Sequence, residues 1–234
     1  MPELIWEGKY NKNGEKSSPV RISLPFQTIE SVNENLEERQ KGFSLFVSDK
    51  PNEWRNRLIW GDKKYILPSL LPEFSGKVNL IYIDPPFDTG ADFSMKLSIP
   101  PDPNKKGNVE KNSENEFIKE PSIIEQKAYR DTWGDGRTNH LDNYLKWFYE
   151  TIVILRDSLS EDGSIYIHLD WHAGHYAKCI LDEIFGKQNY RNEIIWYYST
   201  LGRPKDRFAY KHDCIFCYGK SEKAFFNIDD AKIP

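Results

Sequence analysis

Short apolar runs alternate along the chain with stretches in which apolar residues recur every three or four positions. Runs rich in β-branched and aromatic residues are typical of buried strands, and the three-to-four spacing indicates the buried face of a helix. The runs predict strands at 58–60, 78–83, 164–170, 194–198, 214–218 and 224–226. The helical spacing predicts helices at 63–71, 141–159 and 172–185, with Pro72 ending the first of them.

Strand and helix alternate from residue 58 to residue 198, which predicts an α/β sheet with helices on both faces. The links around the first predicted helix are short, so we expect its flanking strands to be parallel with a right-handed crossover. We divide the chain into an N-terminal extension, 1–56, and a core region, 57–234. Within the core region, 98–125 is rich in Pro, Lys, Asn and Glu, and we expect a mobile insertion there.

A stiff turn, Asp84-Pro85-Pro86-Phe87, directly follows the strand predicted at 78–83. Proline fixes φ and cannot donate to a β-ladder, so the two prolines stop the strand abruptly. In open α/β sheets, ligands bind at the carboxyl ends of strands. Asp84 and the Pro85 carbonyl could accept hydrogen bonds from the amino group of a flat ligand while Phe87 stacks on its ring. The plainer interpretation is a strand that ends in a Pro-Pro turn, with Asp84 as a local cap.

The net charge of −4 provides no overall basic field of the kind that a self-sufficient DNA-binding domain carries. One segment near the C-terminus is nevertheless locally basic, with Phe208 and Tyr210 between its charges. Such a segment can contact phosphates and unstacked bases, although a solvated surface hairpin is the alternative. Its basic residues are Arg203, Lys205, Arg207 and Lys211.

Other catalytic and metal-binding patterns are missing from the sequence. It contains no Gly-x-Gly-x-x-Gly, no phosphate-binding Gly-x-x-x-x-Gly-Lys and no Gly-x-Ser-x-Gly. His168, His172 and His175 are close in sequence, but His168 falls on a predicted strand and two histidines are too few for a closed metal site. We therefore predict no metal site.

The cysteines and the hydropathy of the chain bear on its compartment. Cys214 and Cys217 lie inside an apolar strand pattern without a second pair to complete a zinc site, so we interpret them as core thiols. Three cysteines without a disulfide framework suit a reducing cytoplasm. No signal peptide is present, and no apolar run approaches the ~20 residues of a membrane span. We expect a cytoplasmic protein that does not contact a membrane.

Several ordered motifs of this chain resemble the amino-group DNA methyltransferases of restriction-modification systems. They include Leu-Ile-Trp-Gly-Asp at 58–62 and the segment 77–90, which holds the Asp-Pro-Pro-Phe turn. The order is similar to the β group, in which Asp-Pro-Pro-Tyr/Phe precedes the glycine motif of the cofactor site. The resemblance continues through 162–170, 182–186, 192–196 and 212–213.

The resemblance implies a Rossmann-like methyltransferase sheet that uses S-adenosylmethionine to methylate an exocyclic amine, most readily N6 of adenine in DNA. An Asp before Pro-Pro favours adenine over cytosine N4. The catalytic residues implied are Asp84, Pro85, Pro86 and Phe87. Gly61, Asp62 and Asp84 are implied in cofactor binding, and the DNA contacts would come from Phe87 and the four basic residues between 203 and 211.

The chain departs from this family in one respect, because no Phe-x-Gly-x-Gly motif occurs before Pro234. We therefore expect the N-terminal catalytic part of a Mod-like DNA methyltransferase, ending before the recognition region and the glycine motif. Its expected partners are DNA and a C-terminal half, a recognition subunit or a restriction subunit. The alternatives are a non-catalytic methyltransferase-like module that binds DNA or a partner, a cytosine-N4 methyltransferase, and an amino-methyltransferase of RNA or small molecules.

Overall fold

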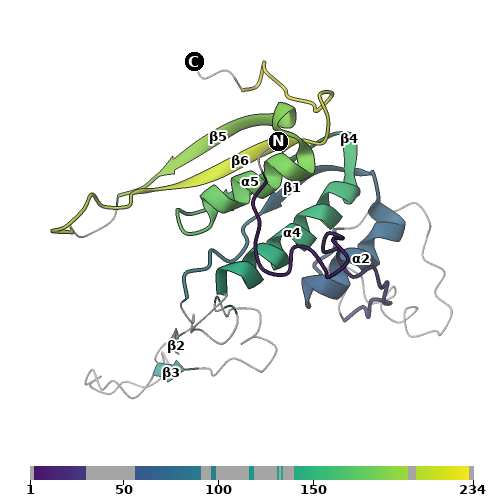
Figure 1. Cartoon of the computed structure of the whole chain (residues 1–234), viewed down its shortest axis with the longest axis horizontal. Helices are drawn as coiled ribbons and strands as arrows, with labels where there is room; N and C mark the ends of the chain where they lie inside the picture. Colours follow the sequence, from purple (N-terminus) through teal and green to yellow (C-terminus); the bar gives the residue numbers. More distant parts are fainter. Residues whose placement is uncertain are drawn as a thin grey trace, which may run out of the picture.

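The computed structural model describes residues 3–29, 56–90, 131, 133, 140–199 and 204–231, and the backbone of two short strands at 96–98 and 116–118. Its helices are α2 (Lys63–Phe74), α4 (His140–Ser158), α5 (Gly174–Phe185) and the 3-10 helix η2 (Lys187–Asn189). Its strands are β1 (Val78–Ile83), β2 (Lys96–Ser98), β3 (Glu116–Ile118), β4 (Leu159–Leu169), β5 (Tyr190–Tyr197) and β6 (His212–Gly219). Figure 1 shows their arrangement.

The main sheet has four strands in the order β1-β4-β6-β5. β1 pairs with β4 in parallel, and β6 is antiparallel to both β4 and β5. The carboxyl ends of β1, β4 and β5 therefore meet the amino end of β6 at one edge of the sheet. β2 and β3 form a separate antiparallel pair. In an open α/β sheet the edge where the carboxyl ends meet is where a ligand is expected.

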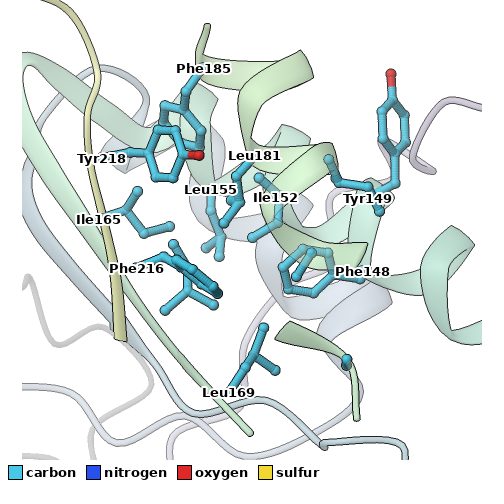
Figure 2. Close-up of a cluster of buried hydrophobic side chains, with 14 of the residues drawn as sticks. Phe148, Tyr149, Ile152, Leu155, Ile165, Leu169, Leu181, Phe185, Phe216 and Tyr218 are labelled. Carbon is cyan, nitrogen blue, oxygen red and sulfur yellow. The ribbon is translucent and has the colours of Figure 1, made fainter. Parts of the chain in front are cut away.

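The hydrophobic core lies between this sheet and two helices. Ile165, Ile167 and Leu169 alternate along β4 and are fully buried, so they share one face of the sheet. The apolar stripes of α4 and α5 pack on that face, with Phe148 and Leu181 among the contacting side chains (Figure 2). The predicted α/β sheet is confirmed, and in the described part of the chain its covering helices α4 and α5 lie on one face.

The reverse face of β1 carries exposed apolar side chains. Leu80 and Tyr82 are 61% and 57% exposed. A hollow of about 310 Å³ lies on this side, lined in part by Leu80, Tyr166 and Phe225. Among the described residues, this face is therefore much less covered than the face beneath α4 and α5.

The N-terminal extension contributes to the core through residues near its start. The Trp6 ring is 5% exposed and lies 5.6 Å from the Tyr149 ring on α4. Lys9 is fully buried, and its Nζ lies 2.6 Å from a Glu183 carboxylate oxygen on α5. The ring contact fixes the extension to α4, and the ion pair fixes it to α5.

Strand predictions were confirmed at 78–83, 164–170, 194–198 and 214–218, with boundaries shifted by up to five residues in the structure. The strands predicted at 58–60 and 224–226 were wrong, because those residues join no ladder in the described chain. Leu58 is fully exposed, and Phe225 and Phe226 are 73% and 66% exposed. An apolar run becomes a strand only where a neighbouring strand pairs with it.

The prediction that Pro72 ends the first helix was also wrong. α2 continues to Phe74 and contains both Pro68 and Pro72. Pro72 lies in the last turn, where its missing N–H removes only the hydrogen bond to the carbonyl four residues earlier. The Ser75 N–H, which donates to the Leu71 carbonyl at 2.9 Å, closes the helix instead. The predicted insertion at 98–125 falls almost wholly outside the described residues.

Lys63 at the start of α2 links this helix to α4. Its Nζ donates to the Trp147 carbonyl at 2.8 Å and to the Thr151 hydroxyl, and it lies 4.3 Å from the centre of the Trp147 ring. Burial lowers the pKa of Lys63 from its ordinary 10.5 to about 8. A charged ammonium in this setting therefore costs stability, because burial disfavours the charged form.

Between pH 8 and 10.5 the unfolded chain should bind more protons at Lys63 than the folded chain does. The free energy of unfolding should therefore increase with pH across this window, by about 1 kcal/mol per pH unit. Denaturant unfolding of the wild type and Lys63→Met at several pH values measures this, because titrations common to both proteins cancel in the difference. A difference that stays constant from pH 8 to 10.5 would contradict the assignment.

Candidate active site

The Asp-Pro-Pro-Phe turn begins where β1 ends. The parallel ladder that pairs Ile83 with Ile167 holds the carboxyl end of β1 against β4. The Asp84 side chain, directly after Ile83, is 60% exposed and accessible to a ligand. Phe87 packs partly against the core, with its ring centre 5.5 Å from that of His168 in an edge-to-face arrangement. The turn thus presents an open carboxylate beside an anchored aromatic ring.

The residues after Phe87 are held by Asp131, a carboxylate that is only 4% exposed. Its oxygens accept hydrogen bonds from the Asp88 N–H at 2.9 Å and from the Thr89 N–H and hydroxyl at 2.8 and 2.7 Å. The Asp131 carbonyl accepts from the Gly90 N–H at 3.1 Å. These contacts stabilise the backbone of Asp88, which has a φ of 62°. Few non-glycine residues adopt this left-handed conformation.

Tyr144 on α4 fixes the middle of the turn. Its ring is fully buried, and its hydroxyl donates to the Pro86 carbonyl at 2.8 Å. Burial raises the pKa of Tyr144 well above its ordinary value, which keeps the hydroxyl protonated as a donor. His140, at the start of the same helix, lies 3.1 Å from the Asp88 carboxylate, and burial raises the pKa of Asp88. Helix α4 therefore sets the position of the turn as well as covering the sheet.

The other two residues implied in cofactor binding, Gly61 and Asp62, lie just before α2. Asp62 is exposed and caps the helix, because its Oδ1 accepts from the Lys64 N–H at 2.9 Å. Gly61 has a φ of +151°, and an added Cβ would lie 3.1 Å from Ile66 Cδ1. One oxygen of Asp62 is thus engaged by the helix, and the backbone at Gly61 favours glycine.

The basic segment returns to the edge of the sheet that carries the turn. Lys205 and Arg207 are exposed, while the backbone carbonyl of half-buried Lys211 accepts from the Tyr198 N–H at 3.0 Å. Tyr210 stacks on Trp171, which follows β4, with ring centres 4.4 Å apart. Arg203 lies outside the described residues. Tyr210 therefore lies near the carboxyl end of β4, and the Arg207 guanidinium lies beside it, 5.7 Å from the centre of the Tyr210 ring.

Among the residues that the structure describes, no three His, Cys, Asp or Glu side chains are grouped so that they could hold a metal ion.

Cys214 and Cys217 lie in β6, and burial raises the pKa of Cys214 to about 12, so this thiol stays protonated. In the same described ranges, no helix has the length and apolar character needed to cross a membrane.

Sequence reasoning did not find the residues that hold the turn. Asp131 and Tyr144 contact it from far along the chain, and the sequence pattern assigns His168 no role at the turn. Tyr144 falls on the buried stripe of the helix predicted at 141–159, which is the one sequence signal that pointed toward it. A hydroxyl on an otherwise apolar stripe calls for a hydrogen-bond partner.

A family model described as a DNA methylase, of the N6/N4 type, matches residues 78–234. The chain belongs to this family. The match includes β1, the Asp84 turn and all of the sheet described above.

Several curated proteins resemble most of the chain. The Mod subunit of the type III restriction-modification enzyme EcoP15I from Escherichia coli is 31% identical over 94% of this chain and 32% of its own length. The type II methyltransferase M.EcaI from Enterobacter cloacae is 30% identical over 89% of this chain and 39% of its own length. The EcoPI Mod subunit of Escherichia phage P1 is 28% identical over 94% of this chain and 32% of its own length. The chain thus spans about a third of the length of these relatives.

Among solved structures, the cytosine-N4-specific PvuII DNA methyltransferase aligns with 42% of this chain and with 40% of its own chain. The two sequences are 17% identical over the match, and the TM-score is 0.34. The family assignment rests on the match of the family model to residues 78–234.

The Asp131 contacts predict a local effect on the turn. Asp131→Ala removes the three hydrogen bonds that the turn donates to this carboxylate, and a fourth from Trp133 Nε1, so hydrogen exchange at the Asp88 and Thr89 amides should become at least ~10-fold faster. Thr89→Val removes only the hydrogen bond from the Thr89 hydroxyl, so it should accelerate hydrogen exchange at these amides less than Asp131→Ala does. Exchange at β6 amides serves as the internal control, and unchanged exchange at Asp88 and Thr89 in Asp131→Ala would show that Asp131 does not hold the turn.

Proposed function

We propose that this chain is the catalytic part of an S-adenosylmethionine-dependent DNA methyltransferase that methylates N6 of adenine, within a Mod-like protein of a restriction-modification system. The observation that carries the proposal is the exposed Asp84 carboxylate at the carboxyl end of β1, on a turn fixed by Tyr144 and Asp131. Family membership and the Mod-subunit relatives support the reaction class.

The substrate base must leave the DNA stack to reach this turn, at a cost of a few kcal/mol. Phe87 would stack on the extruded base, since its ring is held by the core and by His168. Asp84 and the Pro85 carbonyl would accept hydrogen bonds from the two protons of the exocyclic amine. Those contacts draw the nitrogen lone pair out of conjugation with the ring, which makes the amine a better nucleophile.

The chain supplies positioning and charge rather than a nucleophile of its own. Asp84 stabilises the positive charge that develops on the amine during transfer, and a preset turn needs little reorganisation at that moment. Tyr144 and Asp131 keep the turn preset. The Asp before Pro85 and Pro86 supports adenine rather than cytosine as the substrate base.

S-adenosylmethionine would supply a methyl group activated by its sulfonium. Gly61, Asp62 and Asp84 are the residues that we assign to its binding. The donor set fits this molecule, because exposed carboxylates suit ammonium and sulfonium charges and ribose hydroxyls.

DNA is the proposed partner of the basic segment, where Lys205, Arg207 and Lys211 would contact phosphates near the turn. Arg203 is assigned the same role from the sequence. A C-terminal half, a recognition subunit or a restriction subunit would complete the enzyme, and we place its action in the cytoplasm.

A second candidate function is a methyltransferase-like module that binds a partner without catalysis. The exposed Leu80 and Tyr82 on the reverse face of β1, beside the hollow, favour it. Calorimetric titration with S-adenosylmethionine separates the two candidates, because the module predicts no binding of the cofactor.

Transfer of a labelled methyl group from S-adenosylmethionine to DNA tests the catalytic proposal. Asp84→Ala should lower the rate by at least ~100-fold, because it removes the acceptor that activates the amine. Glu222→Gln is the matched control, since it removes an exposed negative charge far along the chain from the turn. Labelling by Asp84→Ala at the wild-type rate would refute the role of Asp84, and an inactive wild-type chain would refute catalysis by this chain.

A further inference from the structure

Four polar side chains form a line across the edge of the sheet where the Asp84 turn lies. Each strand of the main sheet contributes one member: Asp84 follows β1, His168 is in β4, Asp213 is in β6 and Tyr198 follows β5. His168 Nδ1 lies 3.4 Å from Asp84 Oδ1, and His168 Nε2 lies 3.3 Å from Asp213 Oδ2. The Tyr198 hydroxyl donates to Asp213 Oδ1 at 3.0 Å.

The pairing of the strands determines which residues can meet in this line. His168 alternates with the buried Ile167 and Leu169, so it projects from the opposite face of β4. Its partner in the ladder is Ile215, two residues from Asp213 on the same face of β6. A one-residue change of register would turn His168 into the core and separate it from both carboxylates.

Solvent access falls from one end of the line to its middle. The Asp84 side chain is 60% exposed, whereas those of His168 and Asp213 are 18% and 14% exposed. Both oxygens of Asp213 have partners, in Tyr198 and His168. The shielded members are thus the best anchored, and the accessible member is the one placed to meet a ligand.

We propose that His168 is a positioning residue for Asp84. Its Nδ1 holds Oδ1 of Asp84, which leaves the other oxygen directed toward the amine of the substrate, while Asp213 and Tyr198 fix the orientation of the imidazole ring. The catalytic consequence rests on the proposed methyltransferase function, whereas the side-chain contact itself does not.

The chemistry of imidazole explains why a second carboxylate is needed. A histidine between two carboxylates satisfies both only when both ring nitrogens act as donors. Asp213 anchors the ring at Nε2, and without that partner the imidazole could rotate away from Asp84. A carboxylate that orients a catalytic imidazole in this way is a recurrent device in enzymes. Phe87, whose ring meets that of His168 edge to face, restricts the ring further.

Ring nitrogen resonances test the contact without any measurement of activity. In the full chain labelled with ¹⁵N-histidine, His168→Asn identifies the His168 signals by their loss. Asp84→Asn should shift mainly the Nδ1 resonance, and Asp213→Asn mainly the Nε2 resonance. The exposed His175 signals should not move in either variant. If neither substitution changes the His168 resonances, the proposal is wrong.

Methylation by two conservative variants tests the catalytic consequence. The amide of Asn can occupy the place of Nδ1, and the longer side chain of Gln reaches the place of Nε2. His168→Gln should therefore lower kcat by at least ~10-fold with little change in the KM for DNA, and His168→Asn should retain more activity. His175→Gln is the matched control on the surface of α5.

The outcomes separate this proposal from the proposed function. Wild-type kcat in both His168 variants would overturn the positioning role. If the wild-type chain transfers no methyl group to DNA, the proposed function fails, and the nitrogen resonances alone decide whether His168 holds Asp84.

Discussion

The parallel ladder between β1 and β4 is the constraint on which the candidate site depends. It places Ile83 beside Ile167, so the chain leaves the sheet at Asp84 in a fixed position next to His168. The burial of Ile165, Ile167 and Leu169 beneath α4 and α5 sets the register of that ladder. A shift by one residue would expose these three side chains and bury His168, so the packing of the core specifies the geometry of the site.

The two prolines make the turn stiff, but residues elsewhere in the chain set its orientation. Tyr144 reaches it from α4, and Asp131 reaches its second half from a segment between β3 and α4. Both groups are buried and hydrogen-bonded, which suits a turn that would have to stay in place while the proposed substrate base enters. Asp84, in contrast, is left accessible. The arrangement therefore separates the residues that hold the turn from the residue that would contact the substrate.

The sequence was sufficient to predict many features that are local in the chain, although not the end of α2, which continues past Pro72. The strand at 78–83, the Asp84 turn and the stripes of α4 and α5 follow from patterns within a few residues, and all appear in the structure. Pairing between distant segments could not be predicted in this way. The apolar run at 58–60 joins no ladder within the residues that the structure describes, and Asp131 acquires its role only when the fold brings it beside Thr89. His168 was likewise recognisable only once β4 lay between β1 and β6.

Identification of the methylated nucleoside tests the central claim most directly. DNA incubated with the chain and S-adenosylmethionine would be digested to nucleosides and analysed by mass spectrometry. The account predicts N6-methyladenine, because the Asp84 turn is assigned to an adenine amine. N4-methylcytosine as the product, or no methylated nucleoside at all, would contradict it.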